Sequence, residues 1–322
     1  MTLRLADKWL WDFWFAQDGS ETHIFYLQAP RALLDPELRH WHVSIGHAVS
    51  QDLRNWEILP DALCPSAQPA WDDRSTWTGS IIQHQGLWHM LYTGTSDADQ
   101  GHNIQRIGLA TSEDLIRWEK HPSNPLIEAD PAWYEMLDLG QWHDQSWRDP
   151  YLFQHPQTGI FYALITARVK RGPTDARGVI GYARSTNFIS WQVMPPLTEP
   201  GHFGTMEVPQ LVEIKGRSYL LFSTLTHTTA AQRLKRTGLP AVTGTHYLVA
   251  DNPLGPFSYT TDHFLAGDEI GSLFAGKLIQ EPSGEWAFIA WRNVAPDDSF
   301  LGELSDPYPV TIDAAGKLGV AW

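Results

Sequence analysis

Three acidic residues, Asp12, Asp149 and Glu207, stand at equivalent positions of an internal repeat, each at the head of an apolar, strand-like run. Equivalent positions in a radially repeated fold converge on one axis. We therefore expect these three carboxylates to face one pocket. Paired carboxylates on either side of a sugar bond perform glycoside hydrolysis, one donating a proton while the other acts as nucleophile or base. The pattern indicates a glycosidase.

The repeat is clearest in a turn motif that follows a short alternating run. A Ser is followed two positions later by Asp or Asn, then by an apolar residue, with an aromatic residue six positions after the Ser; copies span 50–56, 112–118, 185–191 and, more weakly, 251–257. The alternating runs lie at 44–49, 107–111, 179–184 and 246–250, which predicts strand, turn and second strand. Trp56, Trp118 and Trp191 recur in phase, and we expect them in the core.

Five hairpins form the inner halves of the repeat, with turns at Gly19, Gly86, Gly159, Gly216 and Gly284. One inner hairpin and one outer pair make a four-stranded propeller blade. No helical periodicity of useful length and no linker interrupts this pattern, and closed all-β folds reach such lengths as one domain. The sequence predicts a single all-β domain, 1–322, folded as a five-bladed β-propeller.

Composition disfavours several kinds of partner. A formal net charge of −14 and a pI near 5.3 argue against nucleic acid, because phosphates require a basic face. No run approaches the ~18 apolar residues of a membrane helix. Cys64 is single, which fits a reducing compartment, and 1–15 lacks the apolar core of a signal peptide. We expect a cytoplasmic protein, and its oligomeric state is not determined by the sequence.

No metal site or cofactor is predicted. His40 and His42 form a His-x-His pair, and Asp72 and Asp73 are adjacent, but neither pair has completing ligands at metal spacing. Glycine-rich phosphate loops are also missing. The partner that we expect is a small carbohydrate.

Several motifs resemble those of glycoside hydrolase family 32, the invertase and fructanase family. The segment 45–57 (IGHAVSQDLRNWE), followed by 59–63 (LPDAL), resembles its first-blade signature, and 77–80 (WTGS) its second-blade motif. The segment 148–150 resembles its Arg-Asp-Pro motif, and Glu207 falls where its acid/base Glu belongs. The segment 11–14 (WDFW) resembles the nucleophile segment of the related levansucrase family, family 68.

The chain departs from the family 32 pattern in three places. Of the usual Asn-Asp-Pro-Asn-Gly around the nucleophile, Asp12 alone remains. Val208 follows Glu207 where Cys is usual. The chain ends at Trp322, so we expect the propeller without the C-terminal β-sandwich that these enzymes usually carry.

The resemblance implies a role for each motif residue. Asp12 is the nucleophile that attacks the anomeric carbon of a furanoside, and Glu207 protonates the leaving oxygen and then activates water. Asp149 stabilises the transition state by bonding two ring hydroxyls. Arg148 keeps Asp149 ionised and reaches a sugar hydroxyl.

The reaction that the resemblance implies is retaining hydrolysis of a terminal β-fructofuranoside, with sucrose or a short fructo-oligosaccharide as substrate. Three alternatives stay open. A fructosyltransferase would use the same site, an inverting arabinofuranosidase or xylosidase would use comparable blades, and a sugar-binding propeller would use no catalysis at all.

Further residues are candidates for binding the sugar. Thr78 and Ser80 are expected to hydrogen-bond it, and three tryptophans are expected to wall its pocket: Trp14, Trp41 and Trp77. An aromatic insertion at 128–147, which includes Trp142, is expected to form a subsite wall. A second insertion, 226–245, is interpreted equally as a lid or leaving-group contact and as a solvated loop or dimer contact. Two such insertions at the rim predict a short pocket.

Overall fold

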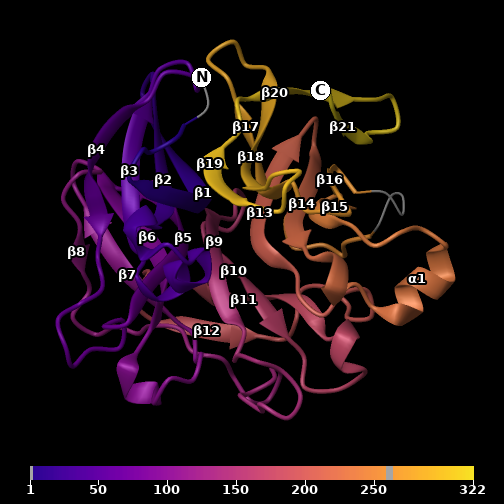
Figure 1. Cartoon of the computed structure of the whole chain (residues 1–322), viewed down its shortest axis with the longest axis horizontal. Helices are drawn as coiled ribbons and strands as arrows, with labels where there is room; N and C mark the ends of the chain where they lie inside the picture. Colours follow the sequence, from indigo (N-terminus) through magenta and orange to yellow (C-terminus); the bar gives the residue numbers. More distant parts are fainter. Residues whose placement is uncertain (1–2, 259–263) are drawn as a thin grey trace.

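The computed structural model describes residues 3–258 and 264–322. Its strands form five separate antiparallel sheets arranged in a ring, with β1, β5, β9, β13 and β17 innermost (Figure 1). The five-bladed β-propeller predicted from the sequence is therefore confirmed. Each blade is a contiguous piece of chain, and strand order follows the sequence from the axis outward, except that β19 of blade five pairs with β18 beside that order.

The blades consist of the following strands. Blade one holds β1 (Lys8–Asp18), β2 (Glu21–Pro30), β3 (Ser44–Ser50) and β4 (Glu57–Leu63). Blade two holds β5 (Ser75–His84), β6 (Leu87–Thr95), β7 (Arg106–Ser112) and β8 (Glu119–Lys120). Blade three holds β9 (Trp147–Gln154), β10 (Phe161–Arg168), β11 (Gly178–Ser185) and β12 (Trp191–Met194). Blade four holds β13 (Glu207–Ile214), β14 (Arg217–Thr224), β15 (Thr243–Ala250) and β16 (Ala266–Asp268). Blade five holds β17 (Leu273–Gln280), β18 (Trp286–Val294), β19 (Phe300–Leu304), β20 (Tyr308–Ile312) and β21 (Leu318–Val320).

The helical segments are short and lie in the connections. They are η1 (Arg31–Leu33), η2 (Pro36–Trp41), η3 (Asp97–Asp99), η4 (Thr174–Ala176), η5 (Thr226–Thr228) and α1 (Ala231–Thr237). Within the described residues, none of these helices has the length and apolar character needed to cross a membrane.

The repeated Ser-x-Asp turn has a common physical basis. In the first copy, Asp52 Oδ1 accepts hydrogen bonds from the amides of Arg54 and Asn55 at 2.8 and 2.7 Å. The apolar residue after the Asp or Asn adopts a left-handed backbone, with φ of 59° at Leu53 and 63° at the two equivalents, Leu115 and Phe188. The short side-chain cap stabilises this strained turn. The repeat is therefore a turn signal as well as a packing signal.

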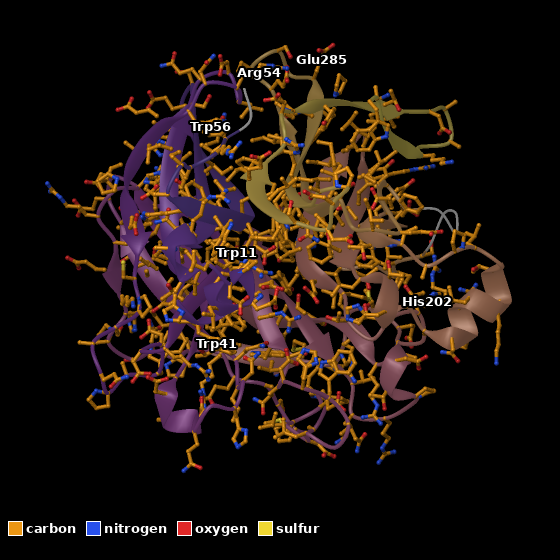
Figure 2. The ribbon with its side chains drawn as sticks, in the orientation of Figure 1. Trp11, Trp41, Arg54, Trp56, His202 and Glu285 are labelled. Atoms are coloured by element: carbon orange, nitrogen blue, oxygen red, sulfur yellow. The ribbon has the colours of Figure 1, made fainter. Side chains whose placement is uncertain are left out.

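The repeated tryptophans are half-buried rather than fully enclosed. Trp118 and Trp191 donate from Nε1 to the carbonyls of Leu115 and Phe188, at 2.8 and 2.7 Å. All three tryptophans pack against the buried clusters from the outer part of their blades, as the position of Trp56 shows (Figure 2). In Trp118 and Trp191 the indole N–H keeps a partner while the ring covers apolar surface.

The ring is closed by contacts between blades five and one. Arg31 Nη2 donates to the carbonyl of Leu301 at 2.9 Å, and the amide of Leu304 donates to the carbonyl of Leu3 at 3.0 Å. Arg54 and Glu281 add an ion pair of 3.1 Å at the outer edge. These contacts join distant segments of the chain and fix the innermost strands around the channel.

Candidate active site

A register shift marks the innermost strand of every blade at an equivalent height. The shifts lie between Trp11 and Phe13 in β1, Trp77 and Gly79 in β5, Glu207 and Gln210 in β13, and Phe274 and Lys277 in β17. In blade three the shift is counted on β10, between Leu164 and Thr166, opposite β9. A bulge of this kind bends its strand and re-aims a side chain. The candidate residues Asp12, Thr78, Asp149 and Glu207 all lie at these bulges.

Backbone strain accompanies three of the bulges. Asp149 has φ of 58°, Val208 of 47° and Ala275 of 50°. Residues with side chains in this region cost roughly 1–3 kcal/mol each, and such strain gathers at functional sites. Val208 is β-branched, for which positive φ is rare. The backbone of Val208, directly after Glu207, is therefore held in a conformation that valine does not favour.

The bulges of blades one, two, three and four border one cavity of about 580 Å³. Asp12, Asp149 and Glu207 line it together with Arg148, as predicted from the repeat phase. Trp11, which precedes Asp12, lies near the middle of the ring, with Trp41 between it and the rim (Figure 2). Three carboxylates from blades one, three and four thus converge on one pocket.

Asp12 is half-buried in the pocket, and its two carboxylate oxygens have different surroundings. Thr78 Oγ1 donates to its Oδ2 at 3.2 Å, while Oδ1 is buried and accepts no hydrogen bond from the described residues. Burial, reinforced by the charges of Asp149 and Glu207, raises the pKa of Asp12 to about 7. An acid in this state gains a proton or loses it near neutral pH.

Glu207 is paired with Arg148. Arg148 Nη2 lies 3.1 Å from Glu207 Oε1, and the same guanidinium reaches Asp144 at 3.0 Å and Asp149 at 3.5 Å. Burial raises the pKa of Glu207, and Arg148 opposes that rise while Asp149 and Asp144 add to it. Because the partner is a fixed charge-assisted donor, the carboxylate of Glu207 has a defined orientation.

Asp149 is fixed by hydrogen bonds from blades three and four. Thr166 Oγ1 and the amide of Val208 both donate to its Oδ2, at 2.9 and 3.1 Å, and its own amide donates to Thr93 Oγ1 at 3.0 Å. The carboxylate of Asp149 therefore also holds the residue that follows Glu207. The positions of Asp149 and Glu207 are therefore coupled through the backbone of Val208.

The sequence matches a known family over most of this architecture. Residues 15–302 match the model of the "Glycosyl hydrolases family 32 N-terminal domain". The chain belongs to glycosyl hydrolase family 32.

Known relatives of this family 32 chain include plant and bacterial proteins. The chain is 25% identical over 326 residues to "Beta-fructofuranosidase, cell wall isozyme" of Pisum sativum, covering 94% of this chain and 55% of that protein. It is 27% identical over 357 residues to "Extracellular sucrase" of Zymomonas mobilis, covering 97% of this chain and 81% of that one. The chain thus spans about half the length of the pea relative.

The same fold occurs in a solved structure of an inulosucrase from Halalkalicoccus jeotgali bound to kestose. The TM-score is 0.73 at 22% identity, and the match covers 98% of this chain and 87% of that chain. At this identity the likeness concerns the fold.

Two tryptophans that we expected at the pocket wall lie there. Trp41 and Trp77 line the cavity with ring centroids 5.6 Å apart, and Trp77 Nε1 donates to the carbonyl of His40 at 2.9 Å. The guanidinium of Arg74 lies 3.6 Å from the centre of the Trp41 ring. Flat aromatic surface held this way suits the apolar face of a sugar ring.

Three predicted binding residues lie elsewhere in this family 32 chain. Trp14 is buried, stacks on Phe25 and lines a second cavity, because two strand residues beyond Asp12 carry it roughly 7 Å along the channel. Ser80 Oγ is buried between the carbonyl of Pro150 and the amide of Leu152, where it joins blades two and three. Trp142 is not among the cavity-lining residues, and its ring covers the guanidinium of Arg168 at 3.6 Å.

The two insertions behave differently. The segment 128–147 contributes His143 and Asp144 to the cavity, while its Tyr134 and Trp147 pack in the core. The segment 226–245 contributes no lining residue to this cavity. Its helix α1 instead packs Arg233 against Phe203.

Several lining residues were not singled out from the sequence as binding residues. Asp144 is buried and accepts from Gln105 and Arg148 at 3.0 Å each. His40 lines the wall, and burial beside Arg39 and Arg148 lowers its pKa to about 3, so its ring is neutral. The position of Asp144 four residues before Arg148 was the available signal. Nothing local distinguished His40 from a surface histidine.

Proposed function

We propose that the chain is a retaining β-fructofuranosidase that hydrolyses a terminal β-fructofuranoside, with sucrose as the preferred substrate. The observation that supports this most is the convergence of Asp12, Asp149 and Glu207 with Arg148 in one cavity. The motif resemblance implies the roles of nucleophile, stabiliser and acid/base for Asp12, Asp149 and Glu207.

The proposed first step forms a fructosyl–enzyme bond. A carboxylate oxygen of Asp12 attacks the anomeric carbon, and the bond to the leaving oxygen breaks as Glu207 gives that oxygen its proton. Asp149 stabilises the positive charge that develops on the ring, and its Oδ2 is fixed by Thr166 and Val208. Because both protein donors meet one oxygen, the carboxylate has a single orientation.

The proposed second step releases fructose. Glu207, now ionised, takes a proton from water as the oxygen of that water attacks the anomeric carbon and Asp12 leaves. Arg148 stabilises the ionised form of Glu207 between the two steps, because its guanidinium lies 3.1 Å away. The stereochemistry at the anomeric carbon is retained after two inversions.

The size of the substrate is argued from the pocket. A cavity of about 580 Å³ is in the range that encloses a small molecule. The names of the pea and Zymomonas relatives, a β-fructofuranosidase and a sucrase, support a fructoside such as sucrose.

The test is product analysis with a panel of glycosides. We expect the purified chain to release fructose from sucrose and raffinose, with the β-anomer first in time-resolved NMR, and to leave nitrophenyl arabinofuranoside intact. Release of arabinose with inversion, and none of fructose, would instead identify an arabinofuranosidase. No turnover of any substrate at high enzyme concentration would favour a binding propeller.

Transfer of fructose to a second sugar is the alternative that shares this site. The fold likeness to an inulosucrase bound to kestose supports testing it. With sucrose as substrate, hydrolysis yields free glucose and free fructose in equal amounts, whereas transfer yields excess glucose. The ratio measured across a range of sucrose concentrations separates the two.

A further inference from the structure

A lysine from blade five is buried beside the carboxylates. Lys277 lies in β17, three residues after Phe274, where the bulge begins, and its side chain is 5% exposed. It lines a second cavity, of about 470 Å³, which shares Thr78 and Asp149 with the carboxylate pocket. A buried ammonium costs free energy unless it is bonded and compensated. Its partners therefore indicate what it does.

The ammonium bonds the backbone that follows Glu207. Lys277 Nζ donates to the carbonyl of Val208 at 2.6 Å and to that of Pro209 at 3.2 Å. On its other side, the amide of Val208 donates to Asp149 Oδ2 at 3.1 Å. Both polar atoms of Val208 are thus held, one by blade three and one by blade five.

These bonds act on a strained residue. Val208 has φ of 47°, an unfavourable conformation for a β-branched residue, and it determines how the bulge aims Glu207. Strain of this kind persists where surrounding contacts over-determine the backbone. The two clamps on Val208 provide that constraint.

The charge of the same ammonium acts on two of the carboxylates. Its charge lowers the pKa of Asp12 against the stronger effects of burial and of Asp149 and Glu207. Burial in turn lowers the pKa of Lys277 to about 8, and the charges of Asp149 and Asp12 oppose that fall. The charged groups around Asp12 are Asp149, Glu207, Lys277, Arg148 and Arg39.

We propose that Lys277 is a positioning residue for the proposed reaction: it clamps the bulge that aims Glu207 and supplies positive charge that keeps Asp12 ionised for attack. This inference rests on the proposed function. It adds a group from blade five to a site whose acidic members come from blades one, three and four. A neutral donor at this position would keep the clamp and lose the charge.

Three substitutions separate the two roles. Lys277→Gln keeps a donor without charge, Lys277→Arg keeps the charge, and Lys277→Met removes both. Lys120→Met is the matched control, because Lys120 Nζ also bonds a buried carboxylate and a carbonyl, Asp72 at 2.6 Å and Cys64 at 2.7 Å, on an outer strand.

The pH profile of kcat/KM on sucrose is the first readout. We expect the acid limb to move up by about one pH unit in Lys277→Gln and Lys277→Met, because Asp12 loses a nearby positive charge. We expect kcat at neutral pH to fall about 10- to 100-fold in Lys277→Met with KM little changed. We expect the acid limb of Lys277→Arg and that of Lys120→Met to lie at the same pH as in the wild type. A uniform loss of kcat with an unmoved limb would show a merely structural lysine and overturn the proposal.

A second readout does not depend on turnover. Carbon-13 NMR of labelled aspartate, with the Asp12 signal assigned by its loss in Asp12→Asn, gives the titration midpoint of that carboxyl directly. We expect a higher midpoint in Lys277→Gln than in the wild type. In the wild type alone, we expect a further step near pH 8 as Lys277 loses its charge.

The outcomes distinguish this inference from the proposed function. An unchanged Asp12 midpoint in the neutral variants, or no step near pH 8 in the wild type if those variants do not fold, would overturn the role of Lys277. A shifted midpoint in an enzyme that releases no fructose would sustain the electrostatic coupling and refute the proposed reaction.

Discussion

Arg148 Nη2 lies 3.1 Å from Glu207 Oε1, whereas Asp12 Oδ1 is buried and accepts no hydrogen bond from the described residues. Burial raises the pKa of both carboxyls, and Arg148 opposes that rise at Glu207 while Lys277 opposes it at Asp12. The proposed reaction needs the proton on Glu207 and the negative charge on Asp12. The charge of Glu207 adds to the rise in the pKa of Asp12, so ionisation of one carboxyl disfavours ionisation of the other, and a bound leaving oxygen would draw the proton to Glu207.

Replacing Glu207 tests its role as proton donor. We expect Glu207→Gln to lower kcat on sucrose by about 10²- to 10⁴-fold, since its leaving oxygen needs a proton. With a fructoside that carries an activated leaving group, the same variant should lower the rate of the first step much less. Glu213→Gln, an exposed position on the same strand β13, is the control and should stay active. Equal losses on both substrates would point to a different acid.

Removing Asp12 tests covalent catalysis. We expect Asp12→Ala to lower kcat by at least about 10⁴-fold on both kinds of substrate, because no fructosyl–enzyme bond can form. Thr78→Val removes the hydrogen bond to Asp12 Oδ2, and we expect a loss of about tenfold from this variant. Azide added to Asp12→Ala should restore turnover as a fructosyl azide. Near-normal activity of Asp12→Ala on sucrose would show that another residue is the nucleophile.

Asp12 should also affect stability in a pH-dependent way. Burial raises its pKa from the ordinary 3.8 to about 7, so below about pH 4 folded and unfolded chains both hold the proton and Asp12 adds no cost. As pH rises the unfolded chain releases the proton first, and the cost of burying charge grows until the pH passes 7. We expect Asp12→Asn to raise the melting temperature at pH 8 but not at pH 4. Asp18→Asn, at the exposed end of β1, should show no such dependence.

The repeat made the carboxylates predictable. Asp12, Asp149 and Glu207 occupy one structural position, because the bulge recurs at the same height in the innermost strands. The position of each carboxylate within the repeat was therefore enough to predict that the three lie together in the fold. The five-bladed fold followed from the same phase together with the turn residues.

Other site residues were hidden because their roles depend on contacts between blades. Lys277 stands in an apolar strand run like any strand lysine, and its importance comes from the carbonyls of Val208 and Pro209 on the next blade. Ser80 was misassigned for the converse reason, since its partners Pro150 and Leu152 belong to blade three. Strand alternation does not reveal which neighbour a side chain meets.

Ser80 should therefore affect stability rather than binding. Its Oγ donates to the carbonyl of Pro150 at 2.6 Å and accepts from the amide of Leu152 at 2.7 Å, both buried. Ser80→Ala leaves these two groups unsatisfied, which costs roughly 1–3 kcal/mol. We expect a melting temperature lower by several degrees and an unchanged KM for sucrose. A raised KM at unchanged stability would return Ser80 to the binding site.

The shape of the pocket predicts a preference for short substrates. The cavity of about 580 Å³ is lined by Trp41 and, from the 128–147 insertion, by His143 and Asp144. A furanose and a small leaving sugar occupy such a space, and further residues of a fructan would have to pass the rim. We expect kcat/KM to fall from sucrose to kestose to inulin. The side chain of His143 is 73% exposed at this rim. His143→Ala should therefore bring kcat/KM for kestose closer to that for sucrose, without changing kcat on sucrose. Values that stay equal or rise with chain length would show that the rim admits long chains, and would identify an exo-fructanase.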